Sequence, residues 1–441
     1  MFISREYFTT KTGKMELFET DSLSGKTQPI TQEQVTEGYR KVRLNKGAGG
    51  VDRQSLEDFD LHRASNLYKL WNRMASGSYF PSAVKGVEIP KVDGSYRLLG
   101  IPTVLDRTAQ QVVRSVLEPI MEPIFHEDSY GYRPGRSAHD AVAKCEERCR
   151  SYRWVIDMDI KGFFDNIDHD LMMEVIKHYT SEEWILMYIK RWLTSPMILP
   201  NGKKVERTKG TPQGGVISPL LANMFLHVVF DAWMQKYYAD TEYGSIRWER
   251  YADDIVVHCN NEKQAKYLLN RIKERFKSCK LELHPAKTKI VYCKQNNRRG
   301  GFKHTKFDFL AFSFKPRRIY EVKGGKVNKW WGYCAGISDK SCRYIISQIR
   351  DRKIHRATGA EITEIAESLS SKLRGWINYF IRFYPSALHE VFSALHSRLA
   401  RWITNKYKKY RRRIYKAKSR LREISRDFPN LFEHWKYGYT P

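Results

Sequence analysis

The chain has 441 residues and a formal net charge of +28, from 77 basic and 49 acidic residues. This length suits two or three domains that share enough core to fold without disulfides. The positive excess is far larger than solubility requires, so it predicts a polyanionic partner, nucleic acid first and an anionic membrane second. Aromatic residues make up 13% of the chain and offer nucleobases rings on which to stack. A basic surface without a partner is the lesser alternative.

Seven cysteines are scattered along the chain, and only Cys145 and Cys149 stand at helical i,i+4 spacing. No second Cys or His pair accompanies them at zinc-finger spacing, so we interpret the cysteines as buried or free thiols in a reducing compartment. No apolar run reaches about 18 residues, which argues against a membrane span and against a membrane partner. The N-terminus lacks the apolar core of a signal peptide, so we expect a cytoplasmic protein.

The N-terminal region predicts one helix followed by a loop. Residues 1 to about 30 are polar and without periodicity, so we expect them to be loose. A helix should begin at Thr31, with Gln34 completing a capping box. The glycine-rich run 45–52 then breaks the helix. It lacks the Lys-Ser/Thr ending of a P-loop, so a plain loop and a phosphate-binding loop both remain open.

A β-hairpin is predicted where apolar segments at 84–90 and 96–102 flank an Asp-Gly turn. Such a hairpin would carry three cations: Lys85, Lys91 and Arg97. These cations suit a triphosphate, because arginine can bind phosphate through two parallel hydrogen bonds. The alternative is that they are solvated edge-strand charges that prevent aggregation.

Apolar residues at helical spacing predict helices over about 106–124, 138–150, 169–193, 218–234 and 262–278. A basic loop rich in Gly and Pro, with Arg133 and Arg136, precedes the second of these helices. A short strand is expected at 280–283, after the last of them.

Two acidic segments follow apolar residues that favour strands. Tyr251-Ala252-Asp253-Asp254 lies between such residues, which predicts a hairpin with two acids at its tip. In the strand that begins at Trp154, Asp157 and Asp159 share one face. Fixed carboxylates repel each other unless a cation lies between them, and Mg²⁺ binds carboxylate oxygens together with substrate phosphate. A third carboxylate would let a second metal join, as phosphoryl transfer by paired metals requires.

The C-terminal part is predicted to be helical and basic. Residues 317–332 are basic and are interpreted as a link to a last domain. Three helical patterns follow from about Ser338, with breaks near Gly359 and at Pro385. The run from Arg401 to Arg426 is the strongest cluster of positive charge and predicts a helix that follows phosphates, with a merely solvated face as the alternative.

Four motifs together resemble the reverse transcriptases encoded by group II introns. The motifs are Asp159-x-x-x-Phe163-Phe164-Asp165, Thr211-Pro212-Gln213-Gly214-Gly215, Tyr251-Ala252-Asp253-Asp254 and Phe309-Leu310-Ala311-Phe312-Ser313-Phe314. They occur in the order of that family and at its approximate spacing. The resemblance runs from about Asn45 almost to the C-terminus. Residues 375–380 resemble the thumb of the family, also called its maturase domain.

The resemblance implies an α+β right-hand polymerase, with fingers and an antiparallel palm sheet followed by an all-α thumb. We expect an N-terminal extension of the fingers at 1–80 and fingers and palm at 81–316. The thumb or maturase domain would occupy 317–400, and a basic DNA- and RNA-binding tail 401–441. The chain should be a form without the C-terminal His-Asn-His endonuclease that many family members carry.

The resemblance also implies which residues act. Asp159, Asp253 and Asp254 would be catalytic and would bind two Mg²⁺ ions, with Mn²⁺ as a substitute. The implied nucleotide-binding residues are Lys85, Lys91, Arg97, Ile160, Phe164, Gln213, Gly214 and Lys287. The implied primer grip is Phe309, Leu310 and Ala311, where alanine replaces the usual glycine of the family. The expected nucleic-acid contacts are Arg133, Arg136, Lys408, Lys409, Arg411, Arg412, Arg413 and Lys416.

Two of these roles carry particular chemistry. The Phe164 ring would clash with a 2′-hydroxyl and so select deoxynucleotides. Lys287 matches a family lysine near the leaving pyrophosphate, where it could act as a general acid; a surface lysine without a role is an equal alternative. Asp157 and Asp165 are expected to be structural or to support the metal-binding acids.

The implied activity is RNA-directed DNA synthesis from an RNA template, a DNA primer and dNTPs. A second function, as a maturase that binds its group II intron RNA and supports splicing and insertion into target DNA, is compatible with the first. Two alternatives remain. One is an RNA-binding splicing cofactor only, and the other is a domesticated reverse transcriptase in phage defence or CRISPR adaptation.

Overall fold

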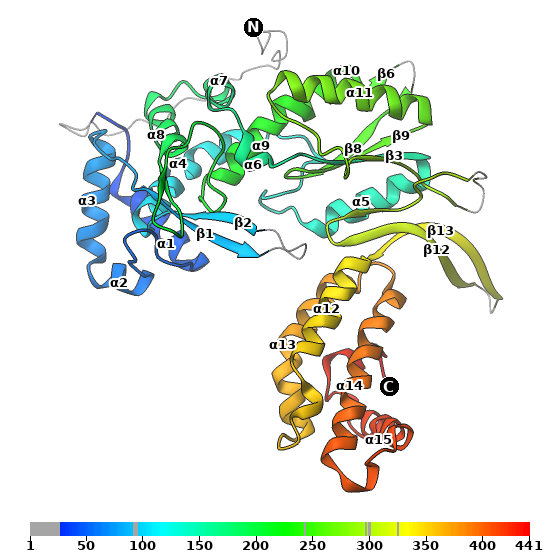
Figure 1. Ribbon diagram of the computed structural model, residues 1–441. Coiled ribbons are helices and arrows are strands. Elements are labelled where there is room, and N and C mark those ends of the chain that lie inside the picture. Colours follow the sequence, from blue (N-terminus) through cyan, green and yellow to red (C-terminus); the bar gives the residue numbers. More distant parts are fainter. Residues whose placement is uncertain (1–26, 91–95, 242–243, 296–297, 299–300, 324–325) are drawn as a thin grey trace. The chain divides into compact units, whose positions relative to one another are not determined.

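The structure is a computed structural model that describes residues 27–90, 96–241, 244–295, 298, 301–323 and 326–441 (Figure 1). The chain divides into two compact units, each assembled from several segments. Unit 1 consists of Met1–Ser137, Met158–Ile255 and Lys263–Thr288; unit 2 consists of Ala138–Asp157, Val256–Glu262 and Lys289–Pro441. Among the helices of the described ranges, none has both the length and the apolarity to cross a bilayer.

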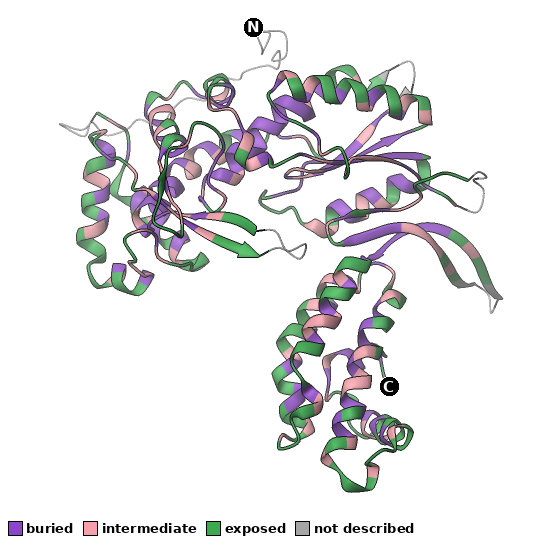
Figure 2. Ribbon diagram, in the orientation of Figure 1, coloured by how far each residue is buried: buried purple, intermediate pink, exposed green. Residues whose placement is uncertain are grey.

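Unit 1 is mainly helical. Its helices are α1 (Gln32–Asn45), α2 (Leu56–Leu61), α3 (Arg63–Ala75), α4 (Val104–Met121), α6 (Phe163–Asn166), α7 (His169–Tyr179), α8 (Glu183–Thr194), α9 (Ser218–Leu226), the π-helical turn η2 (His227–Asp231), α10 (Ala232–Tyr237) and α11 (Glu262–Ser278). The predicted capping box of α1 is confirmed: Gln34 N–H donates to Thr31 Oγ1, and Thr31 N–H donates to the Gln34 side chain. Helix α11 buries one stripe of residues and exposes the rest (Figure 2).

Two predicted helices of unit 1 are interrupted. The expected helix 169–193 is two helices, because Thr180 adopts an extended conformation at the end of α7. The expected helix 218–234 passes through the π-helical turn η2, which places Asp231 in the core. The strand expected at 280–283 is a single bridge between Ile160 and Leu283.

Two four-stranded sheets carry the strands that matter for the site. The first has the order β2-β1-β4-β5, with β1 (Val84–Pro90), β2 (Tyr96–Ile101), β4 (Met197–Ile198) and β5 (Lys204–Val205). The second has the order β10-β3-β9-β8, with β3 (Trp154–Asp159), β8 (Arg247–Tyr251), β9 (Asp254–Cys259) and β10 (Lys289–Tyr292). A small pair joins β6 (Asp240–Thr241) to β7 (Gly244–Ser245).

The predicted hairpin of unit 1 is confirmed, because β1 and β2 pair antiparallel with Ile89 opposite Arg97. Its expected turn, together with Lys91, lies outside the described residues.

Unit 2 contains a second, longer hairpin. Strands β11 (Phe307–Phe309), β12 (Phe312–Lys323) and β13 (Lys326–Ile337) form an antiparallel sheet. The prediction of a plain link at 317–332 is therefore wrong: these residues pair from Phe312↔Ile337 out to Lys323↔Lys326. Bulky and charged residues alternate in this segment, which is the period of a β-strand. The high positive charge of the segment led to its interpretation as a link. The expected boundary between 316 and 317 falls inside β12.

The remainder of unit 2 is helical. It contains α5 (Ala138–Ser151), α12 (Asp339–Asp351), α13 (Ile362–Phe380), α14 (His389–Lys406), α15 (Ile414–Asp427) and the 3₁₀ turns η3 (Ile354–Arg356), η4 (Pro385–Leu388), η5 (Lys408–Tyr410) and η6 (Glu433–Tyr437). Helix α14 contacts both α12 and α15, and its residues Leu395, Leu399 and Trp402 are buried. The three predicted helical patterns after Ser338 are confirmed as α12, α13 and α14.

The basic tail is not the single helix that its charge pattern predicted. Helix α14 ends at Lys406, where Tyr407 turns extended with φ −107° and ψ 117°. The chain passes through η5, and Arg412 adopts a left-handed conformation with φ 60° before α15 begins.

Candidate active site and nucleic-acid interface

The acidic turn lies between β8 and β9. Tyr251 ends β8, Ala252 and Asp253 form the turn, and Asp254 begins β9. Ala252 has φ 56°, a left-handed value that tight two-residue hairpin turns require. Asp253 therefore stands in the turn itself, whereas Asp254 is the first residue of the strand, so the two acids do not share the tip equally.

The loop around Gly131 holds this turn in place. Tyr130 N–H donates to the Arg250 carbonyl at 2.8 Å, and Arg250 N–H donates to the Asp128 carbonyl at 2.9 Å. A Cβ at Gly131 would lie 2.4 Å from the amide nitrogen of Ala252. Only glycine permits this approach, so the loop fits directly against the acidic turn.

A buried ion pair supports the same turn from within. Arg250 and Asp231 are both fully buried, and their closest N–O distance is 2.5 Å. Arg250 also donates to Asn223 Oδ1 at 2.9 Å and to the Ala252 carbonyl at 3.3 Å. Burial alone would raise the pKa of Asp231, but the charge and hydrogen bonds of Arg250 outweigh burial and lower the pKa of this carboxyl. Both groups are thus charged, and the pair ties the π-helical turn to the residue before the acidic turn.

A cavity of about 500 Å³ brings the predicted site residues of unit 1 together. Asp159 and Asp253 both line it, although 94 positions separate them in the sequence. Six of the eight predicted nucleotide-binding residues line it as well: Arg97, Ile160, Phe164, Gln213, Gly214 and Lys287. Lys85 is absent from the described lining, because it lies on β1 opposite Ile101 rather than beside Arg97.

The charges of this cavity interact. Burial raises the pKa of Asp253, and the neighbouring Asp159 raises it further, while Arg97 and Arg250 act in the opposite direction. Lys287 Nζ lies 2.7 Å from Asp159 Oδ2. The pKa of Tyr132 is also raised, by burial first and by Asp253 next. Two carboxylates in mutual repulsion, balanced in part by cations, form a site that would gain stability from a bound metal ion.

The segment from Leu281 to Thr288 fixes Asp159 and brings Lys287 to it. Lys161 N–H donates to the Glu282 carbonyl at 2.9 Å, and His284 N–H donates to the Asp159 carbonyl at 2.7 Å. Asp159 N–H donates to Thr288 Oγ1 at 3.4 Å. Hydrogen bonds to the backbone of Asp159 and of Lys161 thus hold the two segments that form the ion pair between Lys287 and Asp159.

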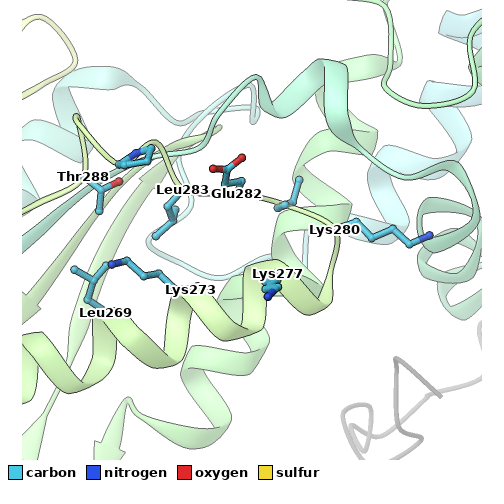
Figure 3. Close-up of a pocket in the computed structure, with 9 residues that line it drawn as sticks. Leu269, Lys273, Lys277, Lys280, Glu282, Leu283 and Thr288 are labelled. Atoms are coloured by element: carbon cyan, nitrogen blue, oxygen red, sulfur yellow. The ribbon is translucent and has the colours of Figure 1, made fainter.

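A second cavity, of about 650 Å³, lies between α11 and this segment (Figure 3). Lys273, Lys277 and Lys280 line it, but the chains of Lys273 and Lys280 extend in different directions (Figure 3). Lys280 is already paired with Asp168 at 2.6 Å. These lysines do not converge on one point, so this cavity lacks the geometry of an anion site despite its larger volume.

The floor of the cavity that Asp159 and Asp253 line depends on close backbone contacts. Gly214 has φ 126°, and a Cβ there would lie 2.5 Å from the Gly100 carbonyl oxygen. Gly100 N–H in turn donates to the Gln213 carbonyl at 2.8 Å. The Gln213 side chain reaches Asp165 Oδ1 at 3.5 Å. The loop thus joins β2, which carries Arg97, to Asp165 in α6.

The predicted primer-grip residues form a tight turn in unit 2. Phe309 pairs with Phe312, and the two residues between them, Leu310 and Ala311, have φ values of 50° and 69°. A turn of this kind favours glycine, which explains the glycine usual in the resembled family. Tyr379 Oη donates to the Leu310 carbonyl at 3.0 Å and stabilises the turn from α13.

The predicted nucleic-acid contacts differ in their accessibility. Arg133 is buried, and its guanidinium donates to Glu122 and to the carbonyls of His126 and Ser129. Those bonds use its donors, so its burial and contacts favour a structural role over the predicted nucleic-acid contact. Arg136 is exposed and donates to the Glu127 carbonyl at 2.7 Å. The six predicted tail cations, Lys408, Lys409, Arg411, Arg412, Arg413 and Lys416, are all exposed.

Sequence reasoning missed Tyr132, Asp231 and Arg250. Tyr132 sits in the basic loop and has φ 59°, which no residue pattern predicts for a tyrosine. Asp231 and Arg250 lie 19 positions apart and meet only because of the π-helical turn. The sequence offers one signal for this pair: Arg250 lies in a segment that otherwise predicts a buried strand, and a buried arginine needs an acidic partner.

Comparison with known proteins decides the family. A model described as reverse transcriptase (RNA-dependent DNA polymerase) matches residues 89–314, about half of the chain. The chain belongs to the reverse transcriptase family. A second model, described as group II intron, maturase-specific domain, matches residues 343–421.

Several curated relatives are similar to this chain. Protein YkfC of Escherichia coli is 32% identical over 304 residues, which cover 60% of this chain and 78% of the relative. Group II intron-encoded protein LtrA of Lactococcus lactis is 36% identical over 192 residues, 43% of this chain and 31% of LtrA. Nuclear intron maturase 1 of Arabidopsis thaliana is 28% identical over 89 residues, 20% of this chain and 12% of the relative. The chain thus spans about a third of the length of LtrA.

Proposed function

We propose that this protein is an RNA-directed DNA polymerase that copies an RNA template into cDNA. The observation that carries the proposal is the cavity that Asp159 and Asp253 share with Arg97 and Lys287, in a chain of the reverse transcriptase family. In this proposal unit 1 supplies fingers and most of the palm of a right-hand polymerase, and the helices α12–α15 serve as its thumb.

The carboxylates have the donor chemistry of a magnesium site. Asp159 and Asp253 face one cavity, repel each other, and offer the oxygen ligands that Mg²⁺ prefers. Asp254 begins the adjoining strand and would be the third carboxylate, so that two Mg²⁺ ions could be held. Bound Mg²⁺ would lower the pKa of the primer 3′-hydroxyl and neutralise the triphosphate and the leaving pyrophosphate.

The remaining side chains position the substrates. Arg97 reaches the cavity from a paired strand, where its guanidinium can hold phosphate oxygens in two parallel bonds. Lys287, held against Asp159, can donate a proton to the leaving pyrophosphate. Phe164 lines the same cavity and would place its ring against the sugar, which disfavours a 2′-hydroxyl. Most of the rate enhancement would then come from position and neutralised charge.

Primer extension tests the proposal. Wild type should extend a DNA primer on an RNA template with dNTPs and Mg²⁺. Asp253→Ala/Asp254→Ala should lower the rate by several orders of magnitude, because charge stabilisation is the largest contribution to such catalysis. Asp170→Ala is the matched control, since Asp170 is an exposed acid of the same unit outside the cavity. Full extension by the double variant would refute the assignment of the acids, and no extension by wild type would refute the polymerase.

A second function is favoured by one independent observation. The maturase-specific match runs from residue 343 in α12 to residue 421 in α15 and includes the exposed cations between Lys408 and Arg413. We propose that this part binds group II intron RNA and assists its splicing, in addition to DNA synthesis. Catalysis does not require this role, so a chain without extension activity that still binds intron RNA would be a splicing cofactor only.

A further inference from the structure

An aromatic pocket of about 620 Å³ in unit 2 is lined by residues of α14, η5 and α15. Its floor is Trp402 and Ile403, which are almost fully buried. Its rim carries Tyr407 and Phe428, which are 40% and 61% exposed. The pocket therefore combines a fixed apolar floor with large rings that are open to solvent, and its volume is in the range of pockets for small ligands.

The exposed rings of this pocket are those of its rim, because the Trp402 ring of the floor is covered and Lys406 Nζ lies 5.5 Å from its centroid. The Trp402 indole donates its N–H to the Ala357 carbonyl at 2.8 Å, so the indole offers the pocket only its ring. Trp402 and Tyr407 are arranged edge to face, as are Tyr407 and Tyr410, with ring centroids 6.0 and 6.4 Å apart. These pairs pack on each other, so a flat, π-rich ligand would stack on the exposed rings of Tyr407 and Phe428 at the rim.

The charge beside the pocket is positive. Arg411, Arg412 and Arg413 follow η5 directly, are exposed, and have no carboxylate partner in the part of the chain that the structure describes. Lys409 Nζ lies 5.0 Å from the centroid of the Tyr410 ring. The acid in the lining, Glu423, is paired with Arg420 at 2.9 Å. A ligand for this place should therefore pair a flat ring with several negative charges.

The backbone of the basic loop is strained at Arg412. Arg412 has φ 60°, which costs a non-glycine residue of order 1 kcal/mol or more. This conformation stands just before α15 begins, whereas the break after α14 is at Tyr407. Strain of this kind persists where the surrounding structure requires it.

We propose that this pocket binds one extruded nucleobase of an unpaired RNA segment, while the loop from Lys408 to Arg413 binds the flanking phosphates. Aromatic side chains stack unpaired bases, and sequence-specific RNA recognition uses mainly loops and bulges whose bases can be displaced. The choice of RNA over DNA rests on the proposed maturase role, because the maturase-specific match covers Trp402, Tyr407 and the arginines.

The test separates the base from the phosphates. The probes are a 12-nucleotide single-stranded RNA and a sugar–phosphate chain of the same length without bases, each with a fluorescent end label. Binding of both to the full-length protein is measured by fluorescence anisotropy without dNTPs. Phe428→Ala should lower the preference for the base-bearing probe about tenfold and leave the affinity for the abasic probe unchanged.

The matched control is Tyr415→Ala, because Tyr415 is 82% exposed on α15 and does not line the pocket. It should keep the wild-type preference. An equal preference in wild type and Phe428→Ala would overturn the pocket. A single-stranded DNA of the same length that bound more tightly than the RNA would overturn the choice of RNA. An acidic peptide with aromatic residues serves as a competitor. If it displaced the RNA from wild type and from Phe428→Ala equally well, the proposed base-binding role of the pocket would be overturned. The binding assay contains no dNTPs and does not depend on DNA synthesis. A failure of primer extension would therefore not change its result.

Discussion

Arg250 stands three positions before Asp253 and is fully buried with its partner Asp231. Its guanidinium holds Asp231, Asn223 and Ser129, and also the carbonyl of Ala252 in the acidic turn. Four separate elements thus meet at one side chain that never reaches the cavity. Arg250 is a positioning residue, because it acts on Asp253 through the backbone of the turn.

Variants of Arg250 should separate its contribution to the stability of the fold from its contribution to the position of the acidic turn. Arg250→Met leaves Asp231 buried and unpaired, so the free energy of unfolding should fall by about 3–5 kcal/mol in urea denaturation. Arg250→Met/Asp231→Leu removes both charges and should recover most of that loss. Primer extension by this stable double variant should remain low, because the Ala252 carbonyl still lacks its donor. Extension at the wild-type rate by the double variant would show that the ion pair contributes stability alone.

The residues of the site differ in how well the sequence alone predicts their roles. Asp159, Asp253 and Gln213 belong to short motifs with fixed neighbours, so their meeting in one cavity could be predicted. Arg133 also belongs to a motif, but charge alone does not reveal that Glu122 and backbone carbonyls take up its donors. Arg250 and Asp231 depend on a π-helical turn, which a pattern of apolar residues does not distinguish from a continuous α-helix.

Elements were predicted best where one local signal determines them. The hairpin of β1 and β2 and the capping of α1 follow from turn and cap chemistry, and both are confirmed. The β12–β13 hairpin was missed because its basic residues suggested a solvated link. Its strands are defined by their pairing with each other, which no local signal in the sequence determines. The tail was predicted as one helix, because helical spacing continues through Tyr407 to Arg413 while the backbone does not.

The last segment of the chain is attached to α14 by two histidines. Their Nε2 atoms lie 2.9 Å apart, and Trp435 Nε1 donates to His396 Nε2 at 3.4 Å. His396 Nε2 therefore accepts both bonds, and His434 carries its proton on Nε2. Burial lowers the pKa of His396 to about 4, with the nearby His389 adding to the effect and a hydrogen bond from His396 to the Tyr439 backbone opposing it. Burial also lowers the pKa of His434 well below its usual value, and His396 adds to this.

This attachment should weaken in acid. Both histidines are neutral in the folded and unfolded states above pH 6.5, so their contribution is complete there. As the pH falls from 6.5 toward 4, the unfolded histidines take up protons that the folded ones resist, and stability is lost. The His396 contribution to this loss should reach about 3 kcal/mol.

Thermal unfolding between pH 7.5 and 5 measures the effect. His396→Gln keeps an acceptor but cannot titrate, so its melting temperature should fall less between these values than that of wild type. His62→Gln is the matched control, since His62 is exposed, and it should follow wild type. Parallel curves for wild type and His396→Gln would show that the histidine pair does not govern the acid response.

At the scale of the whole molecule, the charge of +28 indicated nucleic acid before any motif was considered. It could not indicate which cations are free, because many are paired on the surface: Lys280 with Asp168, Lys406 with Glu361 and Arg374 with Glu433. Within the described part of the chain, no carboxylate pairs with the exposed arginines from 411 to 413. The useful quantity is therefore the number of unpaired cations at one place rather than the total.

That number should appear in the salt dependence of RNA binding. For single strands, the logarithm of the binding constant falls with the logarithm of salt concentration with a slope of about 0.7 for each phosphate contact. Arg411→Gln/Arg412→Gln/Arg413→Gln removes three such contacts, so the slope for single-stranded RNA should decrease by about 2. Lys263→Gln/Lys273→Gln/Lys277→Gln removes the same charge from exposed positions of α11 and should leave the slope nearly unchanged. If both triple variants lowered the slope equally, the RNA would be sensing the net charge of the protein, and the loop beside the aromatic pocket would have no special part in binding.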